Sequence, residues 1–525
     1  MARAPILPGW AGLALGAAIA SAVAGAEARA QLVDYEPAAR ATPVQQDAAW
    51  RLAFRPGMQV LQQTVGQLRA AAPPAVQQQV DALVAEAAKQ PEPEARRTLW
   101  RAVSLMSGQA WTPGQELIGA LALRTPSQIW TGANDMLTVE TLYPAAGGGQ
   151  ATYALELFAS QPTTSATPKK GALVRPVTQG VLDGRYPAQV KASLGGLPDG
   201  AYLLLAKVTA GAASTEIVQQ VYLLRDLDAR YAALKRELAA VPGHEEAKAL
   251  AEYPYALAQA MKAGRREIVS YDFPAAMKRS ADLLAALKAG RDPVRQAKGL
   301  QNRAYRFAET GELIPFQVYV PSTWTPAKRW PLVVALHGAN LDETNMLGRD
   351  GGRMQKLAEQ HGFVVVTPLG YRLNSAYGSQ RGFSRALAAD PERVKRSEQD
   401  VLQVADLVEK EFNVDPRRRY LTGNSMGGGG TWWIGGRYPD RWAAIAPGAY
   451  GGVLPEDTPA LSKLPIRFIV GEKDDLMLDS VRKTLATLKA GGVNPEYVEV
   501  PGGTHPSAFE IELPAIFDFF EKHAK

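Results

Sequence analysis

One short stretch constrains this chain more than any other. It is Gly423-Asn424-Ser425-Met426-Gly427, a serine with a glycine two residues away on each side. Residues 419–422 before it have an extended pattern, and residues 427–438 after it have a helical composition. The stretch therefore predicts a strand, a sharp turn and a helix, with the serine exposed at the tip of the turn. A serine hydroxyl needs such exposure, and a base beside it, to act as a nucleophile. Five-residue patterns also recur by chance, so an incidental serine in a glycine-rich turn stays open at this point.

The C-terminal part of the chain, from residue 301, alternates short apolar runs with helical patterns. Strands are predicted at 316–321, 331–336, 363–367, 443–446, 466–470 and 497–500, and helices near 351–361, 397–412, 427–438, 478–490 and from 508. Strands that alternate with helices predict a doubly wound, mostly parallel sheet. The continuous apolar run Pro331–Leu336 is typical of a strand that is buried on both faces. The predicted fold class is therefore α/β over residues 301–525.

Three further features follow predicted strands of this sheet. Asp474 follows strand 466–470, His505 follows strand 497–500, and the turn His337-Gly338-Ala339 follows strand 331–336. In an open parallel sheet, reactive groups gather at the carboxyl ends of the strands. We therefore expect an acid, a histidine and a glycine turn to lie at the same edge as Ser425.

This combination resembles the α/β-hydrolase superfamily, in which the serine, the acid and the histidine follow in the order Ser425, Asp474, His505. The serine turn and residues 437–444 (RYPDRWAA) resemble polyhydroxybutyrate depolymerases and feruloyl or acetylxylan esterases. The prolyl oligopeptidase-like esterases share much of this wording, and residues 315–338 (PFQVYVPSTWTPAKRWPLVVALHG) also resemble that branch. Residues before about 300 carry no comparable resemblance.

Chemistry and resemblance together assign roles to these residues. Ser425 would attack an acyl carbonyl, His505 would accept the serine proton and later give it to the leaving group, and Asp474 would orient the imidazole. The backbone N–H groups of Met426 and Ala339 are the candidate donors to the tetrahedral oxyanion. Such a mechanism needs no metal or organic cofactor, and none is expected.

Several of these assignments have rivals. The chain has five histidines. We expect His337 to belong to the oxyanion turn, His361 to be structural, and His523 to lie in the final helix. Asp475 is the alternative to Asp474 as the acid. Four consecutive glycines, 427–430, allow close packing of the helix on the sheet, although each glycine costs helix stability of up to about 1 kcal/mol relative to alanine.

The loop 368–395 is the longest expected at the carboxyl edge, and it carries Tyr371, Tyr377 and Arg381. These side chains could line a substrate pocket, or they could belong to an ordered surface loop. The short connection between strands 443–446 and 466–470 leaves little room for a lid. An open site of this kind would suit small-molecule or polymer-linked esters.

At 525 residues the chain is too long for one ordinary core, so more than one domain is expected. Residues 31–115 are expected to form a linker and a helical segment, with prolines at 91 and 93 separating two helices. Residues 116–225 alternate with a period of two, around 137–141, 153–157, 202–208 and 218–222, which predicts a small β-sandwich-like domain. Residues 226–300 return to helical periodicity and are expected to connect it to the catalytic domain.

The first 30 residues resemble an export signal. Arg3 precedes the apolar run 10–23, and Ala28-Arg29-Ala30 offers a cleavage site before Gln31. That run is short for a membrane span, so no stable insertion is expected after cleavage; an uncleaved anchor is the alternative. We therefore expect a periplasmic or secreted protein.

Composition limits the other functions. The chain has no cysteine, which excludes disulfides, thiolate metal sites and a cysteine nucleophile. The net charge is +6, but lysine and arginine are scattered among acids, so nucleic acid is not expected as a partner. The predicted function is a serine esterase. A prolyl oligopeptidase-like peptidase and a non-catalytic binding protein on a hydrolase scaffold are the alternatives, and nothing in the sequence determines the oligomeric state.

Overall fold

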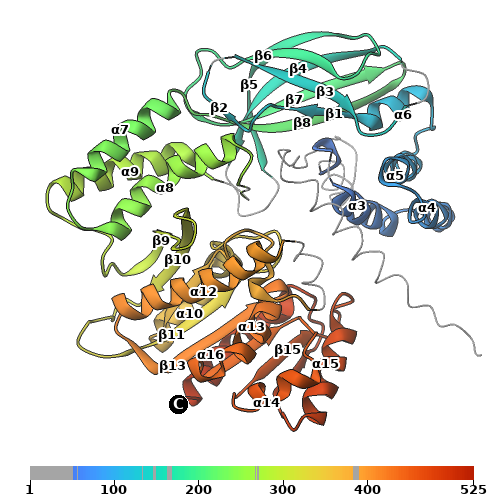
Figure 1. Cartoon of the computed structure of the whole chain (residues 1–525). Coiled ribbons are helices and arrows are strands. Elements are labelled where there is room, and N and C mark those ends of the chain that lie inside the picture. Colours follow the sequence, from blue (N-terminus) through green and yellow to red (C-terminus); the bar gives the residue numbers. More distant parts are fainter. Residues whose placement is uncertain are drawn as a thin grey trace, which may run out of the picture. The chain divides into compact units, whose positions relative to one another are not determined.

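The structure is a computed structural model, and it describes residues 51–55, 57–132, 134–145, 149–161, 168–266, 268, 271–381 and 390–525 (Figure 1). The expected export signal lies outside the described residues. The chain divides into two compact units, one of residues 1–230 with 258–276 and the other of residues 231–257 with 277–525. No helix in the described ranges is long and apolar enough to span a bilayer.

Helices open the first unit. They are α3 (Met58–Ala70), α4 (Pro74–Ala87), α5 (Glu92–Met106) and α6 (Pro113–Ala120). Proline in the first turn of α4, α5 and α6 is compatible with a helix start, where the missing N–H would have no intrahelical acceptor. The two predicted helices are confirmed as α4 and α5. Helix α3 was not predicted, and it buries Leu61 and Val65 in a core shared with Leu99 of α5.

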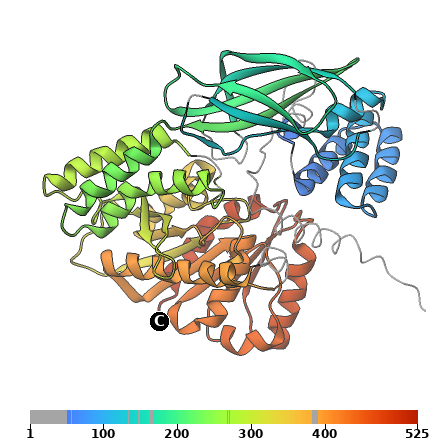
Figure 2. The same cartoon turned by 45° about the horizontal axis from the view of Figure 1, so that its top comes forward.

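The strands of the first unit form two sheets. One has the order β1-β3-β6, and the other has the order β2-β8-β7-β4-β5. The strands are β1 (Leu121–Arg124), β2 (Ile129–Trp130), β3 (Asn134–Thr141), β4 (Ala151–Gln161), β5 (Lys169–Leu182), β6 (Ala188–Ser193), β7 (Gly200–Ala210) and β8 (Ala213–Leu223). Figure 2 shows the sheets as two layers. One core joins them, with Leu137 and Val190 from the first sheet and Leu155 and Leu204 from the second.

The four strands predicted for this region are present as β3, β4, β7 and β8. Strands β1, β2 and β6 were not predicted, and neither was the long strand β5. Its sequence contains glycine, proline and threonine, which favour loops. Strand β5 pairs only with β4 and therefore lies at the edge of its sheet. Pro176 is tolerated there because an edge strand does not need every N–H for pairing.

Three helices follow β8: α7 (Leu227–Ala239), α8 (Glu245–Lys262) and α9 (Phe273–Lys288). Their stripes of buried apolar residues include the predicted positions Leu227, Leu234, Met277 and Leu287. The division between the two units passes through all three helices.

The second unit is built on an eight-stranded sheet of order β16-β15-β14-β13-β11-β12-β10-β9. Strands β11 to β16 run parallel, whereas β10 is antiparallel to both β12 and β9. The strands are β9 (Gly299–Arg306), β10 (Leu313–Val320), β11 (Trp330–Leu336), β12 (Val364–Pro368), β13 (Val414–Asn424), β14 (Ala444–Gly448), β15 (Arg467–Gly471) and β16 (Glu496–Val500). The predicted doubly wound, mostly parallel sheet is confirmed, and every residue of β11 is buried.

Helices cover both faces of this sheet (Figure 1). Val333 and Ala335 of β11 share a core with α10 and α16, whereas Leu336 points to the opposite face and meets α13. The helical elements are α10 (Asn345–His361), η2 (Ala376–Gly378), α12 (Pro391–Glu411), α13 (Met426–Arg437), η3 (Pro439–Arg441), η4 (Pro455–Asp457), α14 (Thr458–Leu461), α15 (Leu478–Ala490) and α16 (Ser507–Lys522).

Helix α12 begins six residues earlier than residue 397, where the sequence pattern placed its start. The Asp390 carboxylate accepts the backbone N–H groups of Glu392 and Arg393 and caps the helix, and Pro391 lies in its first turn. The loop expected over 368–395 is shorter for this reason. The cap is visible in the sequence, but the apolar periodicity starts only at Val394.

Candidate active site

Ser425 alone makes the turn between β13 and α13. Strand β13 ends at Asn424, and helix α13 begins at Met426. The backbone of Ser425 has φ 58° and ψ −123°, a conformation that costs energy for a residue with a side chain and is often found at functional sites. Its N–H donates to the Gly448 carbonyl of the neighbouring strand at 3.0 Å. This bond fixes the turn to the neighbouring strand, and Ser425 is only half-buried.

The glycines around the serine are required by the closeness of the neighbouring elements. A Cβ on Gly427 would lie 2.1 Å from the Leu336 carbonyl oxygen, and a Cβ on Gly428 would lie 2.2 Å from the Gly448 carbonyl oxygen. Gly429 faces the ring of Tyr450 in the same way. The run of glycines therefore lets α13 lie directly against the sheet. This contact explains why the helix tolerates residues that weaken helices.

His505 lies between Ser425 and Asp474. Its Nε2 is 2.9 Å from Ser425 Oγ, and its Nδ1 is 2.8 Å from Asp474 Oδ2. Ser425 follows β13, Asp474 follows β15 and His505 follows β16, so three carboxyl ends of the sheet bring these side chains together. The ring is one quarter exposed, and the carboxylate is fully buried. A hydroxyl, an imidazole and a carboxylate in this line can pass a proton and hold the resulting charge.

The structure also distinguishes Asp474 from Asp475, the two candidates for the acid beside His505. Asp474 Oδ1 accepts the backbone N–H groups of Leu476 at 3.2 Å and Met477 at 3.0 Å. These bonds fix the carboxylate and leave Oδ2 for His505. Asp475, the next residue, is exposed. The structure therefore places Asp474, and not Asp475, against the imidazole.

The glycine turn after β11 lies beside the serine. A Cβ on Gly338 would be 3.6 Å from Ser425 Cβ, so Ala339, the next residue, is in the adjoining turn. Met426 is the first residue of α13, where backbone N–H groups lack helical acceptors. Met426 thus follows Ser425 directly, and Ala339 belongs to the turn that lies beside it.

His337 supports this turn from inside. Its Nδ1 is 2.8 Å from the Gly338 carbonyl and its Nε2 is 2.9 Å from the Leu369 carbonyl. The Tyr377 hydroxyl donates to the His337 carbonyl at 3.2 Å. His337 is buried, and burial lowers its pKa. It is placed to hold the backbone of the turn rather than to exchange protons with a substrate.

The three residues expected to line a substrate pocket differ in their exposure. Tyr377 is fully buried and Tyr371 nearly so, with its ring 5.3 Å from that of Phe307. Their burial does not support contact with a substrate, because the chain at 370–378 folds into the core. Arg381 is partly exposed, forms an ion pair with Asp457 and lies over a tryptophan ring of α13.

Asp400 is a supporting residue that sequence reasoning missed. It is fully buried, and its Oδ2 accepts the backbone N–H groups of Gly370 at 2.6 Å and Tyr371 at 2.9 Å. It therefore anchors the segment whose Leu369 carbonyl meets His337. An acid in an amphipathic helix is usually exposed, so the sequence carries no signal for this role.

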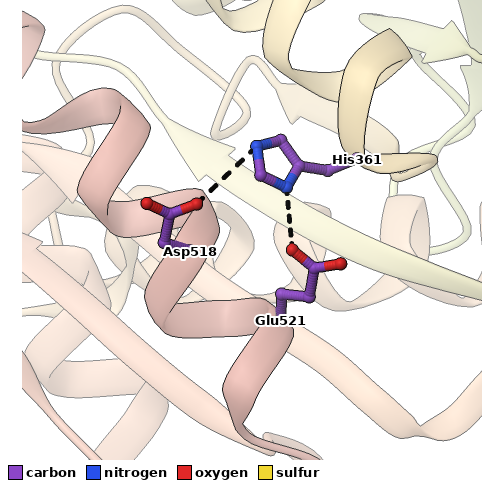
Figure 3. A group of neighbouring side chains, drawn as sticks. All are labelled: His361, Asp518 and Glu521. Atoms are coloured by element: carbon purple, nitrogen blue, oxygen red, sulfur yellow. Dashed lines mark hydrogen bonds and ion pairs between the residues drawn. The ribbon is translucent and has the colours of Figure 1, made fainter.

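One group of side chains in the described part of the chain has the composition of a metal site. His361 at the end of α10 faces Asp518 and Glu521 of α16 (Figure 3). Its Nδ1 is 3.0 Å from Glu521 and its Nε2 is 3.9 Å from Asp518. The three side chains contact one another directly and so join α10 to α16.

The sheet order, the helices on both faces and the serine turn after β13 define residues 299–525 as an α/β-hydrolase fold. Residues 308–451 match the family model Esterase, described as "Putative esterase". The C-terminal region is thus similar to the esterase branch of that superfamily.

Two curated relatives match part of this chain. A bifunctional acetylxylan esterase/xylanase of Neocallimastix patriciarum is 31% identical over 169 residues, which are 32% of this chain and 22% of that protein. A poly(3-hydroxyalkanoate) depolymerase C of Paucimonas lemoignei is 31% identical over 121 residues, which are 23% of this chain and 28% of that protein. The chain spans between a fifth and a third of the length of these relatives.

Solved structures that are similar to this chain include a CE1 ferulic acid esterase of Anaeromyces mucronatus. It is 18% identical, covers 43% of this chain and 90% of its own, and has a TM-score of 0.35. A thermostable esterase is 17% identical, covers 74% of this chain and 95% of its own, and has a TM-score of 0.37.

Proposed function

We propose that the protein hydrolyses carboxylic esters through an acyl-enzyme on Ser425. The observation that carries this proposal is the position of the His505 ring, within hydrogen-bond distance of both the Ser425 hydroxyl and the buried Asp474 carboxylate. The similarity of residues 308–451 to an esterase family supports ester chemistry in particular.

The mechanism follows from these contacts. His505 Nε2 takes the hydroxyl proton as Ser425 Oγ attacks the ester carbonyl carbon, and Asp474 stabilises the imidazolium that forms. The tetrahedral oxyanion accepts hydrogen bonds from the N–H groups of Met426 and Ala339. As the C–O bond breaks, His505 gives the proton to the departing alcohol. A water molecule, deprotonated by the same nitrogen, then releases the acid and restores the serine.

The proposed substrates are esters on small molecules or on polymers. The two curated relatives are named for acetylated xylan and for poly(3-hydroxyalkanoate), both of which are polymers. Only 18 residues separate β14 from β15, which leaves the edge above the site without a long insertion. Export to the periplasm or the medium, as the N-terminal sequence indicates, would bring the protein to such substrates.

The test is hydrolysis of p-nitrophenyl acetate and butyrate by the wild type and three variants. Ser425→Ala should lower kcat by about a thousandfold or more, and Asp474→Asn by a comparable factor. Asp475→Asn is the matched control and should keep wild-type activity. Ester cleavage that survives Ser425→Ala would refute the nucleophile. Peptide cleavage without ester cleavage would favour the peptidase, and neither activity would favour a binding protein.

A further inference from the structure

The loop that carries His505 is held at two consecutive carbonyl groups. Asn424 Nδ2 donates to the His505 carbonyl at 3.4 Å, and Arg349 Nη2 donates to the Pro506 carbonyl at 3.2 Å. The two donors come from different elements, since Asn424 ends β13 and Arg349 belongs to α10. The loop between β16 and α16 is therefore hydrogen-bonded to two separate elements.

Arg349 also holds the start of the following helix. Its Nε and Nη2 lie 2.9 and 2.6 Å from Glu510 Oε1, in the first turn of α16. The two side chains are 13% and 29% exposed, so the pair is partly shielded from water. A charge-assisted contact in such surroundings is stronger than an exposed surface pair. One guanidinium thus fixes the residue after His505 and the helix behind it.

The backbone around Arg349 is unusual. Helix α10 is interrupted there, with Arg349 extended (ψ 157°) and residues 350–352 left-handed. Asp350 has φ 49°, which is costly for a residue with a side chain. Gln355 Nε2 donates to the Leu347 carbonyl at 2.7 Å and so satisfies one acceptor near the break. The interruption occurs at the residue that reaches the His505 loop.

Asn424 shows a similar cost. It is buried directly before Ser425, and its Oδ1 has no hydrogen-bond partner among the described residues. A buried amide with one unsatisfied atom costs stability, so its presence calls for an explanation. The contact with the His505 carbonyl offers one, because it joins the strand that precedes Ser425 to the loop that carries His505.

We propose that Arg349 and Asn424 are positioning residues that hold the His505 imidazole in line with Ser425 and Asp474. This inference rests on the proposed function, because it takes His505 as the base. Loops move more than strands or helices, and a displacement of about 1 Å at a reacting group can cost about a hundredfold in rate. Neither residue touches the reacting atoms, so both act through the backbone of residues 505 and 506.

The experiment compares Arg349→Ala, Arg349→Lys and Asn424→Ala with the control Arg467→Ala in the full-length protein. Arg467 of β15 pairs with Glu512 of α16, and both side chains are 15% exposed. Its ion pairs are with Glu496 and Glu512 rather than with the loop that carries His505. Arg349→Lys keeps the charge but cannot supply the same fork of donors. Two readouts are measured: kcat and KM on p-nitrophenyl acetate, and the downfield proton resonance of the His505 Nδ1–H bonded to Asp474.

Arg349→Ala and Asn424→Ala should each lower kcat by about tenfold or more while KM changes little, and Arg349→Lys should fall between. The downfield resonance should weaken or disappear in the alanine variants and persist in Arg467→Ala. Wild-type kcat and an unchanged resonance in both alanine variants would overturn the proposal. An equal loss in Arg467→Ala would also overturn it, since the effect would then be general destabilisation.

The resonance separates this proposal from the proposed function. A wild type that shows the bonded proton but hydrolyses no ester would refute the esterase assignment. The effect of Arg349→Ala and Asn424→Ala on the same resonance would still decide whether these residues position the ring.

Discussion

At the scale of single residues, the site depends on glycines, which have no side chain to separate the helix from the sheet. The glycines of α13 allow the helix that follows Ser425 to lie against β11, β14 and the buried segment at 376–378. The sequence shows a helix of poor propensity, and the structure shows the contact that outweighs this cost. Packing at van der Waals distance, and not helix propensity, decides which residue is tolerated here.

Two glycines of α13 make this testable. A Cβ on Gly430 would lie 2.6 Å from Tyr377 Cβ, whereas a Cβ on Gly436 would meet Leu461 only at 3.6 Å. Gly430→Ala should destabilise the protein by about 1–3 kcal/mol through overpacking. Gly436→Ala should be neutral or stabilising by up to about 1 kcal/mol.

Urea unfolding of the two variants and the wild type measures the difference. Equal stability of Gly430→Ala and Gly436→Ala would contradict the packing seen around Tyr377.

At the scale of elements, α8 meets β9 and α12 through a group of charges around Arg303. Arg303 of β9 is almost fully buried between Glu246 of α8 and Glu411 of α12, at 3.3 and 2.8 Å. Burial, and then the nearby Glu411 carboxylate, raise the pKa of Glu246 to about 7. One arginine faces two carboxylates, so ionisation of the second carboxyl group is unfavourable.

The stability of this contact should therefore depend on pH. The folded-state pKa of Glu246 lies above its usual value of about 4.5, so the folded protein binds the proton more tightly than the unfolded chain does. The stabilisation from this proton is complete below about pH 4.5 and is lost as the pH rises to about 7. Glu246→Gln keeps the shape without the charge, and it should gain stability relative to the wild type at pH 8.

Urea unfolding at pH 5 and pH 8 gives the comparison. Glu245→Gln, which changes the exposed neighbouring residue, is the control and should show no such pH-dependent gain. A Glu246→Gln variant that is less stable than the wild type at pH 8 would show that the carboxylate is needed as an anion.

At the scale of the whole molecule, the chain combines a two-sheet unit with an α/β-hydrolase unit. The family match lies within the second unit, and the first has its own core. The export signal expected over residues 1–30 lies outside the described residues and stays a prediction from the sequence.

Export predicts a processed N-terminus. Cleavage after Ala30 would leave Gln31 as the first residue, in the periplasm or the medium of a bacterial host. Intact-mass measurement and N-terminal sequencing of the fractionated protein would show it. Replacing Ala28 and Ala30 by bulky residues should block cleavage, whereas replacing Arg29 should not. A cytoplasmic protein that retains Met1 would contradict the prediction.

The sequence alone determined the parallel sheet and the order of the candidate triad. Apolar periodicity identifies strands and helices, and the residue that follows each strand must lie at the carboxyl edge of the sheet. For this reason Ser425, Asp474 and His505 could be named from their positions. Strands β1, β2, β5, β6 and β9 were missed, and the edge strands β5 and β9 lack the apolar pattern of a buried strand.

Only the tertiary structure decided the choice between Asp474 and Asp475, the burial of Tyr371 and Tyr377, and the contacts of Arg349. These outcomes depend on distances between segments far apart in the sequence. A carboxylate, a ring or a guanidinium has the same local sequence signal whether it faces water or a neighbour. Long-range packing, which no local pattern records, determines which of the two it meets.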